Sequence, residues 1–166
     1  MTLIAGCQNK PTITYQDNID SNKLLMLFNN NILKEIRINN ISNYELYFLH
    51  YQDNKLVKKY GLILDENNNK DNLDLIYAIS SNLNNDKIKT ISFLESNALL
   101  KENINFKYNN KYLNTIELKN IDLTKNNKNI ISGLYIDDDK ASIARSNDFF
   151  KDVNKYESLL LILEFK

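Results

Sequence analysis

Short apolar segments separated by polar turns recur along the whole chain, and this pattern constrains the fold more than any other feature. In the segment 35–38, Ile36 and Ile38 alternate with charged residues, as is typical of a β-strand with one buried face. The segment 44–51, Tyr-Glu-Leu-Tyr-Phe-Leu-His-Tyr, is rich in aromatic residues, as a central strand would be. We expect further strands at 12–15, 24–28, 55–64, 73–79, 88–94, 105–108, 112–118, 130–136 and 158–165.

Asparagine-containing turns predict two hairpins. Gln52-Asp53-Asn54 would connect 44–51 to 55–64, and Asn109-Asn110 would connect 105–108 to 112–118, because Asn tolerates the positive φ of tight turns. Strands this short and this frequent predict a mainly β fold, an antiparallel β-sandwich formed by a single domain over residues 12–166.

Helix is expected only in short pieces. Ser96 can cap a helix over 96–102, and acidic residues at the start of 139–150 would favour a second one. The segment 73–79 fits a helix as well as a strand, because its apolar positions match both periods poorly. The polar runs 66–71 and 81–86 are expected to be loops.

Composition limits the classes of function. The chain has 166 residues, of which 43% are hydrophobic, enough for one core without disulfides or metals. Its 21 basic and 21 acidic residues give a net charge of +0, which argues against nucleic acid as a partner, because binding to phosphates requires clustered Lys and Arg. The longest apolar runs, 24–28 and 159–163, are far below the roughly 20 residues that a membrane-spanning helix needs.

The sequence offers little for catalysis, and we expect neither an enzyme nor a cofactor. His50 is the one histidine and lies far from Cys7, so a zinc site is not expected. Beside Leu49 and Tyr51, His50 is better interpreted as a histidine satisfied within a sheet than as a catalyst. The run Asp137-Asp138-Asp139 lacks the spacing of a calcium loop and indicates a turn or helix cap.

The N-terminus carries the most informative motif. Leu3-Ile4-Ala5-Gly6-Cys7 resembles the lipobox of bacterial lipoproteins, in which small residues precede the Cys whose thiol accepts the lipid. The alternative is a small buried Cys near a frayed terminus. In the lipobox interpretation residues 1–6 are the end of a trimmed signal peptide, Cys7 is lipidated, and the segment 8–11 is a short tether, so that residues 1–11 stand outside the folded domain.

Scattered segments resemble the type VI secretion lipoprotein (TssJ/SciN-like) family. The segment 135–143 is similar to that family's Tyr-Arg-Asp-x-Asp-x-Ala stretch, 115–118 to its penultimate strand, and 93–100 to its short helical insertion. Ile136 stands where the family has Arg, and Ile143 where Trp is usual.

This resemblance implies a transthyretin-like β-sandwich, lipid-anchored on the periplasmic face of the outer membrane, that binds the periplasmic domain of an inner-membrane subunit of the secretion complex. It also implies that the loop between the first two sandwich strands makes this contact, here through Asn39, Asn40, Ile41, Ser42 and Asn43. One alternative is a surface-exposed lipoprotein that binds a host molecule or a small ligand, for which a deep apolar pocket would be the distinguishing feature. The other is an enzyme, which would require Cys7 as the nucleophile and His50 as its base.

Overall fold

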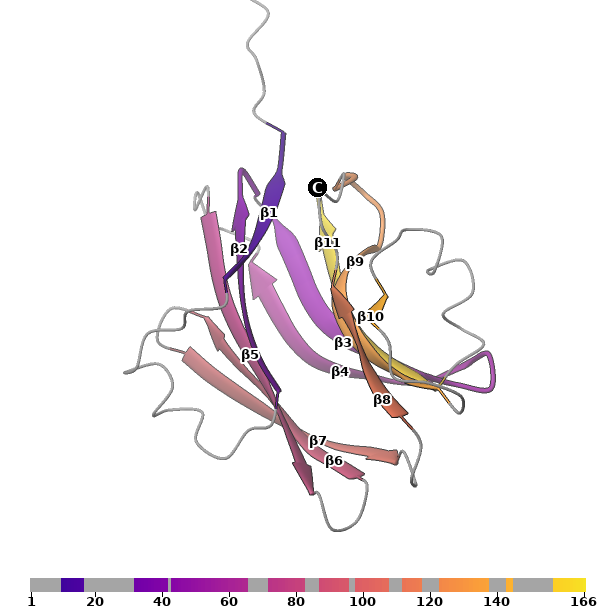
Figure 1. Cartoon of the computed structure of the whole chain (residues 1–166). Helices are drawn as coiled ribbons and strands as arrows, with labels where there is room; N and C mark the ends of the chain where they lie inside the picture. Colours follow the sequence, from indigo (N-terminus) through magenta and orange to yellow (C-terminus); the bar gives the residue numbers. More distant parts are fainter. Residues whose placement is uncertain are drawn as a thin grey trace, which may run out of the picture.

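The computed structural model describes residues 10–16, 32–41, 43–65, 72–82, 87–95, 98–107, 112–117, 123–137, 143–144 and 157–166. These ranges contain eleven strands and no helix, which confirms the predicted mainly β, antiparallel fold. The strands form two sheets that lie on opposite sides of the molecule (Figure 1).

The first sheet has five strands, all paired antiparallel, in the order β1-β2-β5-β6-β7. Its edge strand β1 is the first strand of the described chain, and Thr12 at the start of β1 pairs with Asn39 at the end of β2. Its strands are β1 (Thr12–Gln16), β2 (Ile32–Asn39), β5 (Asn72–Asn82), β6 (Lys87–Glu95) and β7 (Ala98–Lys107).

The second sheet has six strands in the order β10-β8-β9-β11-β3-β4. Its pairs are antiparallel except β10 with β8, which is parallel. Its strands are β3 (Tyr44–Gln52), β4 (Lys55–Asp65), β8 (Tyr112–Glu117), β9 (Asn129–Asp137), β10 (Ile143–Ala144) and β11 (Ser158–Phe165).

Both sheets contribute to one hydrophobic core. Ile36 and Ile38 of β2 and Phe106 of β7 are fully buried in the same cluster as Leu46 and Phe48 of β3. The alternation of Ile36 and Ile38 with Glu35 and Arg37 in the sequence therefore marks the face of β2 that points into this core.

The middle strands of the second sheet are buried on both faces. Along β3, Leu46 and Phe48 belong to the shared core, whereas Tyr47 and Leu49, on the other face, belong to a second cluster with Leu160 of β11. Strands buried on both faces have nearly continuous apolar sequences, as 44–51 and 158–165 do. The prediction of a central strand at 44–51 is thus confirmed, since β3 lies between β11 and β4.

The expected helix at 96–102 is wrong. Residues 98–102 belong to β7, which pairs antiparallel with β6, so that Phe93 lies opposite Leu100 and Leu94 opposite Leu99. The segment 93–100, which resembles the family's helical insertion, is not a helix here, because 93–95 belong to β6 and 98–100 to β7. Helix propensity within a seven-residue segment amounts to little, and pairing with a neighbouring strand outweighs it. The segment 73–79 is also a strand, within β5.

The hairpin expected around Asn109-Asn110 is wrong as well. β7 pairs with β6 in the first sheet, whereas β8 pairs with β9 and β10 in the second, so the chain crosses between sheets after Lys107. The hairpin at Asp53-Asn54 is confirmed, with φ of 49° and 62° at these two residues.

Several expected elements lie outside the described residues. They are the strand at 24–28, the loop 66–71, and the greater part of the helix at 139–150, of which Ile143–Ala144 forms β10. The predicted loop 81–86 begins too early, because Ser81 and Asn82 belong to β5, and its residues 83–86 lie outside the described ranges.

Candidate functional site

The residues predicted to contact a partner lie where the chain passes from β2 to β3, and not between the first two strands as the family resemblance implied. Asn40 and Asn43 are exposed and adopt positive φ of 58° and 48°, whereas Ile41 is only 2% exposed and belongs to the core. Asn39 ends β2, and Ser42 lies outside the described residues. A contact through this loop would therefore use the amides of Asn40 and Asn43, and Ile41 would hold the loop in place.

The described chain starts at the same end of the molecule as this loop. The Asn40 side-chain amide donates a hydrogen bond to the Lys10 backbone carbonyl at 3.2 Å, and the Lys166 amide donates to the Asn43 carbonyl at 3.3 Å. In Figure 1, β1 and the C-terminus lie at the top, beside the start of β3. Cys7, the predicted lipidation site, lies outside the described residues.

His50 is held inside the sheet. His50 is 3% exposed, and its ring lies 5.2 Å from the Phe106 ring and 6.3 Å from the Tyr60 ring, measured between centroids. His50 Nε2 lies 3.4 Å from Glu157 Oε1. Burial lowers the pKa of His50, and the nearby Glu157 carboxylate opposes this shift. These contacts match the prediction of a histidine satisfied within the sheet.

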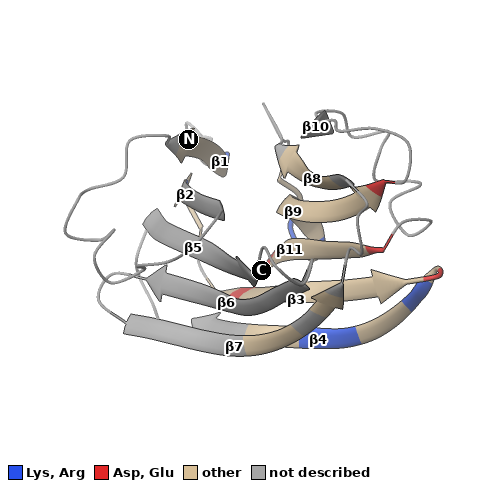
Figure 2. Ribbon diagram, turned by 60° about the horizontal axis from the view of Figure 1, so that its bottom comes forward, with Lys and Arg blue, Asp and Glu red and all other residues tan. Residues whose placement is uncertain are grey.

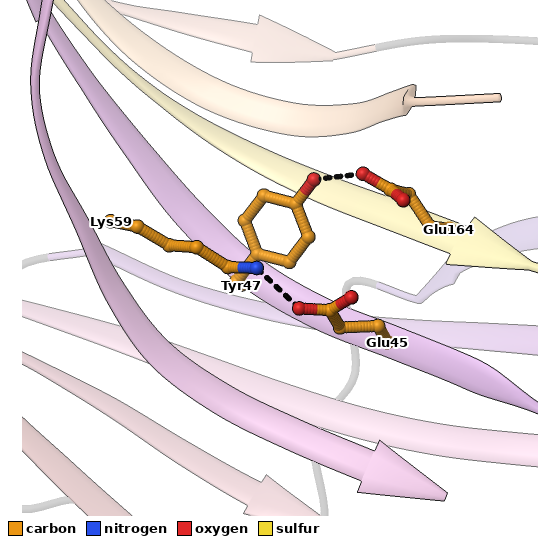
Figure 3. Close-up of polar contacts among 4 residues, drawn as sticks. All are labelled: Glu45, Tyr47, Lys59 and Glu164. Atoms are coloured by element: carbon orange, nitrogen blue, oxygen red, sulfur yellow. Dashed lines mark hydrogen bonds and ion pairs between the residues drawn. The ribbon is translucent and has the colours of Figure 1, made fainter. Parts of the chain in front are cut away.

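A polar network on the opposite face of β3 contains Tyr47. Its hydroxyl donates to Glu164 on β11, and the Lys59 ammonium group on β4 contacts Glu45 (Figure 3). The same ammonium group lies 3.6 Å from the centroid of the Tyr47 ring. Burial, and then the hydrogen bond and charge of Glu164, raise the pKa of Tyr47 well above its ordinary value, so this phenol stays protonated and donating. The network connects three adjacent strands.

Asn129 organises the loop that leads into β9. Its carbonyl oxygen accepts from the Thr124 amide at 2.8 Å, and its amide nitrogen donates to Thr124 O, Asn127 O and Leu163 O at 2.9, 3.0 and 3.1 Å. Since both ends of the amide are satisfied, this buried polar side chain has a structural role.

The segments 135–143 and 115–118, on which the family resemblance rests, lie only partly within the described strands. Tyr135 and Ile136 are buried in β9, Asp137 ends that strand, and Thr115 lies in β8. The rest of the acidic run, Asp138 and Asp139, lies outside the described residues.

The feature that sequence reasoning missed is the exposed end of the β3–β4 hairpin. All eight residues from Gln52 to Lys59 are exposed, including Leu56 and Val57 at 53% and 52%. In Figure 2 the lysines of this hairpin stand out in blue along β4, with an acidic residue in red at its tip. A sequence signal existed, because Lys55-Leu56-Val57-Lys58-Lys59 has its two apolar residues adjacent and not alternating.

Within the described ranges, no group of three or more His, Cys, Asp or Glu side chains is arranged to hold a metal ion. Over the same ranges, no helix has the length and apolar character needed to cross a membrane.

Compared with known proteins, the chain matches no family model, no curated protein and no solved structure.

Proposed function

We propose that this protein is a lipid-anchored, non-catalytic assembly subunit of an envelope-spanning secretion complex of the type VI kind. In this proposal it sits on the periplasmic face of the outer membrane and binds the periplasmic domain of an inner-membrane partner. The observation that carries the proposal is the motif Leu3-Ile4-Ala5-Gly6-Cys7, followed by four residues and then directly by the first strand at Thr12.

The position of the tether is compatible with such a role. Four residues, 8–11, span at most about 14 Å when extended, so a lipid on Cys7 would hold the β domain close to the bilayer. Several acyl chains on one Cys hold a protein durably at a membrane, whereas a single chain binds only marginally. The loop with Asn40 and Asn43 would then lie at the tethered end, since Asn40 bonds to Lys10.

The polar side chains support a structural role. His50, Tyr47 and Asn129 each bond to another side chain or to the backbone of a neighbouring strand or loop. A rigid sheet scaffold that presents loops to a partner requires no bond-making chemistry.

The test is intact mass and membrane fractionation of the chain and of a Cys7→Ser variant, each produced in a bacterium with two membranes. In both proteins the charged and apolar parts of a lipoprotein signal peptide are fused in front of Leu3, so that the chain is exported. We expect the native protein to carry the added mass of a lipid and to pellet with outer membrane, because the thiol is the lipid acceptor. The variant should be unmodified, and a high-salt wash should remove it from that fraction but leave the lipidated protein in place.

Two outcomes would contradict separate parts of the proposal, the lipid anchor and the role in a secretion complex. If both proteins are unmodified and share one fraction, Cys7 is not lipidated and the anchor is wrong. If Cys7 is lipidated but the genome neighbourhood contains no secretion-complex genes, the anchor stands and the assembly role fails.

A further inference from the structure

The end of the β3–β4 hairpin combines exposed apolar side chains with a projecting shape. Among the residues whose side chains the structure describes, Leu56 and Val57 are large apolar residues that lie exposed, at 53% and 52%. They follow the turn at Asp53-Asn54 with only Lys55 in between, and every residue from Gln52 to Lys59 is exposed. This part of the hairpin therefore presents an apolar tip to its surroundings.

The tip is positively charged although the whole chain is neutral. Residues 52–59 contain three lysines and one aspartate, which give a local net charge of +2 in a chain of net charge +0. Lys59 is paired with Glu45, and the Lys58 ammonium group lies 4.7 Å from the centroid of the Tyr60 ring. With Lys59 paired, Lys55 and Lys58 outweigh Asp53 and leave a net charge of +1 around Leu56-Val57.

The backbone of β4 is poorly suited to pairing with a strand from another protein. β4 is the last strand of its sheet, but Leu56 pairs with Tyr51 and Lys58 with His50, so Val57 is an extra residue in a β-bulge. Bulges and lysines on an edge strand are the features that oppose edge-to-edge pairing. A binding partner would therefore meet the side chains of the tip and not its backbone.

We propose that this tip, with Leu56 and Val57 flanked by Lys55 and Lys58, docks on an anionic membrane surface. The two aliphatic side chains would enter the boundary between headgroups and acyl chains, and the ammonium groups would lie level with the lipid phosphates, which the long apolar lysine stems allow. A bilayer requires no shape complementarity, whereas a stable protein interface buries roughly 800 Å² on each partner, far more than two half-exposed aliphatic side chains supply. The charge of the tip complements anionic lipid.

The experiment is flotation of the full chain carrying Cys7→Ser with vesicles of known composition. Vesicles of phosphatidylcholine alone are compared with vesicles in which part of it is replaced by phosphatidylglycerol, at low and high salt. We expect binding to the anionic vesicles, weaker binding to the neutral ones, and loss at high salt, because salt screens exposed charges.

Two double variants locate the contact, and a third is the matched control. Leu56→Ser with Val57→Ser, and Lys55→Glu with Lys58→Glu, should each weaken partition onto anionic vesicles by about tenfold or more. Lys125→Glu with Lys128→Glu makes the same charge change on exposed residues of the loop before β9, and should change partition by less than about threefold. Circular dichroism checks that each variant keeps its strands.

The inference is overturned if the chain does not float with anionic vesicles, or if the two charge-reversal variants lose binding equally. It is also overturned if a photo-crosslinking amino acid at position 56 captures a protein and no lipid in cells. Because these vesicle measurements use protein without the lipid acceptor, their failure leaves the lipid anchor at Cys7 untouched.

Discussion

At the scale of single residues, His50 connects the stability of the sheet to pH. It lies among Phe106, Tyr60 and Glu157, and its cross-strand partner on β4 is Lys58. Burial lowers its pKa from the ordinary 6.5 in spite of the Glu157 carboxylate. The unfolded chain therefore binds a proton at a higher pH than the folded protein does, and the contribution of His50 to stability is lost as the pH falls through and below about 6.5.

This argument predicts the behaviour of a His50→Gln variant. Urea unfolding of both proteins between pH 5 and pH 8 should show that the unsubstituted chain has the larger free energy of unfolding. The difference between the two proteins should be greatest near pH 8. This difference should become smaller as the pH falls, since only the unsubstituted chain must bury a histidine that tends to become protonated. Titrating groups that do not contact His50 are common to both proteins and cancel in the difference. A difference that stays constant over this range would mean that burial does not shift the pKa of His50.

At the scale of elements, the pairing of β9 with β11 depends on a glycine. A Cβ atom added at Gly133 would lie 2.6 Å from the Leu159 carbonyl oxygen and 3.2 Å from the Leu160 Cα atom. Both are backbone atoms of β11, which is itself paired on its other side with β3 and cannot move away freely.

We therefore expect Gly133→Ala to lower the free energy of unfolding by about 1–3 kcal/mol, as overpacking in a core does. Chemical denaturation measures the change. Asn103→Ala, at an exposed position of β7, is the comparison and should change stability by no more than about 0.5 kcal/mol. Equal effects of the two substitutions would show that β9 and β11 tolerate a side chain between them.

Local sequence predicts the pairing of some neighbouring strands correctly and that of others incorrectly. The turn at Asp53-Asn54 could be predicted because two consecutive positive φ angles are a local requirement that Asp and Asn meet. Asn109-Asn110 has a similar local signal, yet β7 and β8 pair in different sheets. The choice of partner depends on which apolar faces meet in the core, and no window of ten residues contains that information.

At the scale of the whole molecule, the first strand reaches across to the second sheet. The Tyr15 hydroxyl on β1 donates a hydrogen bond to the carbonyl oxygen of Ile131 on β9. Between β9 and β11, Ser132 pairs with Leu161 and Ile130 with Ile162, so Ile131 is an extra residue in that ladder. A bulge in one sheet thus provides the acceptor for a side chain of the other.

Tyr15→Phe removes this hydroxyl and leaves a buried carbonyl without its donor. We expect a loss of about 1–2 kcal/mol in the free energy of unfolding, measured by chemical denaturation. Tyr51→Phe makes the same chemical change on a half-buried residue of β3 and should cost about 0.5 kcal/mol or less. If the two substitutions cost the same, the bond between the sheets does not contribute to stability.

The two proposals together define an orientation. Lys10 and the loop with Asn40 lie at one end of β3, and the hairpin tip lies at the other, roughly 26 Å away for a nine-residue strand. A chain held by a lipid at Cys7 and by Leu56-Val57 would lie with β3 along the membrane rather than upright on it.

Part of the candidate site could be predicted from local patterns, and part could not. That His50 is satisfied within a sheet follows from its neighbours Leu49 and Tyr51 on an apolar strand. That Ile41 is buried while Asn40 and Asn43 are exposed depends on the crossing from one sheet to the other. The exposure of Leu56 and Val57 depends on the position of β4 at the edge of its sheet and on the bulge at Val57.

The sequence by itself determined where most described strands lie, because apolar patterning and turn residues act over a few positions. β1, β3, β9 and β11 coincide with the predicted segments to within about a residue or two. Tertiary structure alone decided that 98–102 is a strand, that β7 and β8 belong to different sheets, and that Ile41 is buried while Asn40 and Asn43 are exposed. The physical reason is the same in each case: strand pairing and burial are interactions between residues far apart in the chain, and they outweigh the weak local preferences of a short segment.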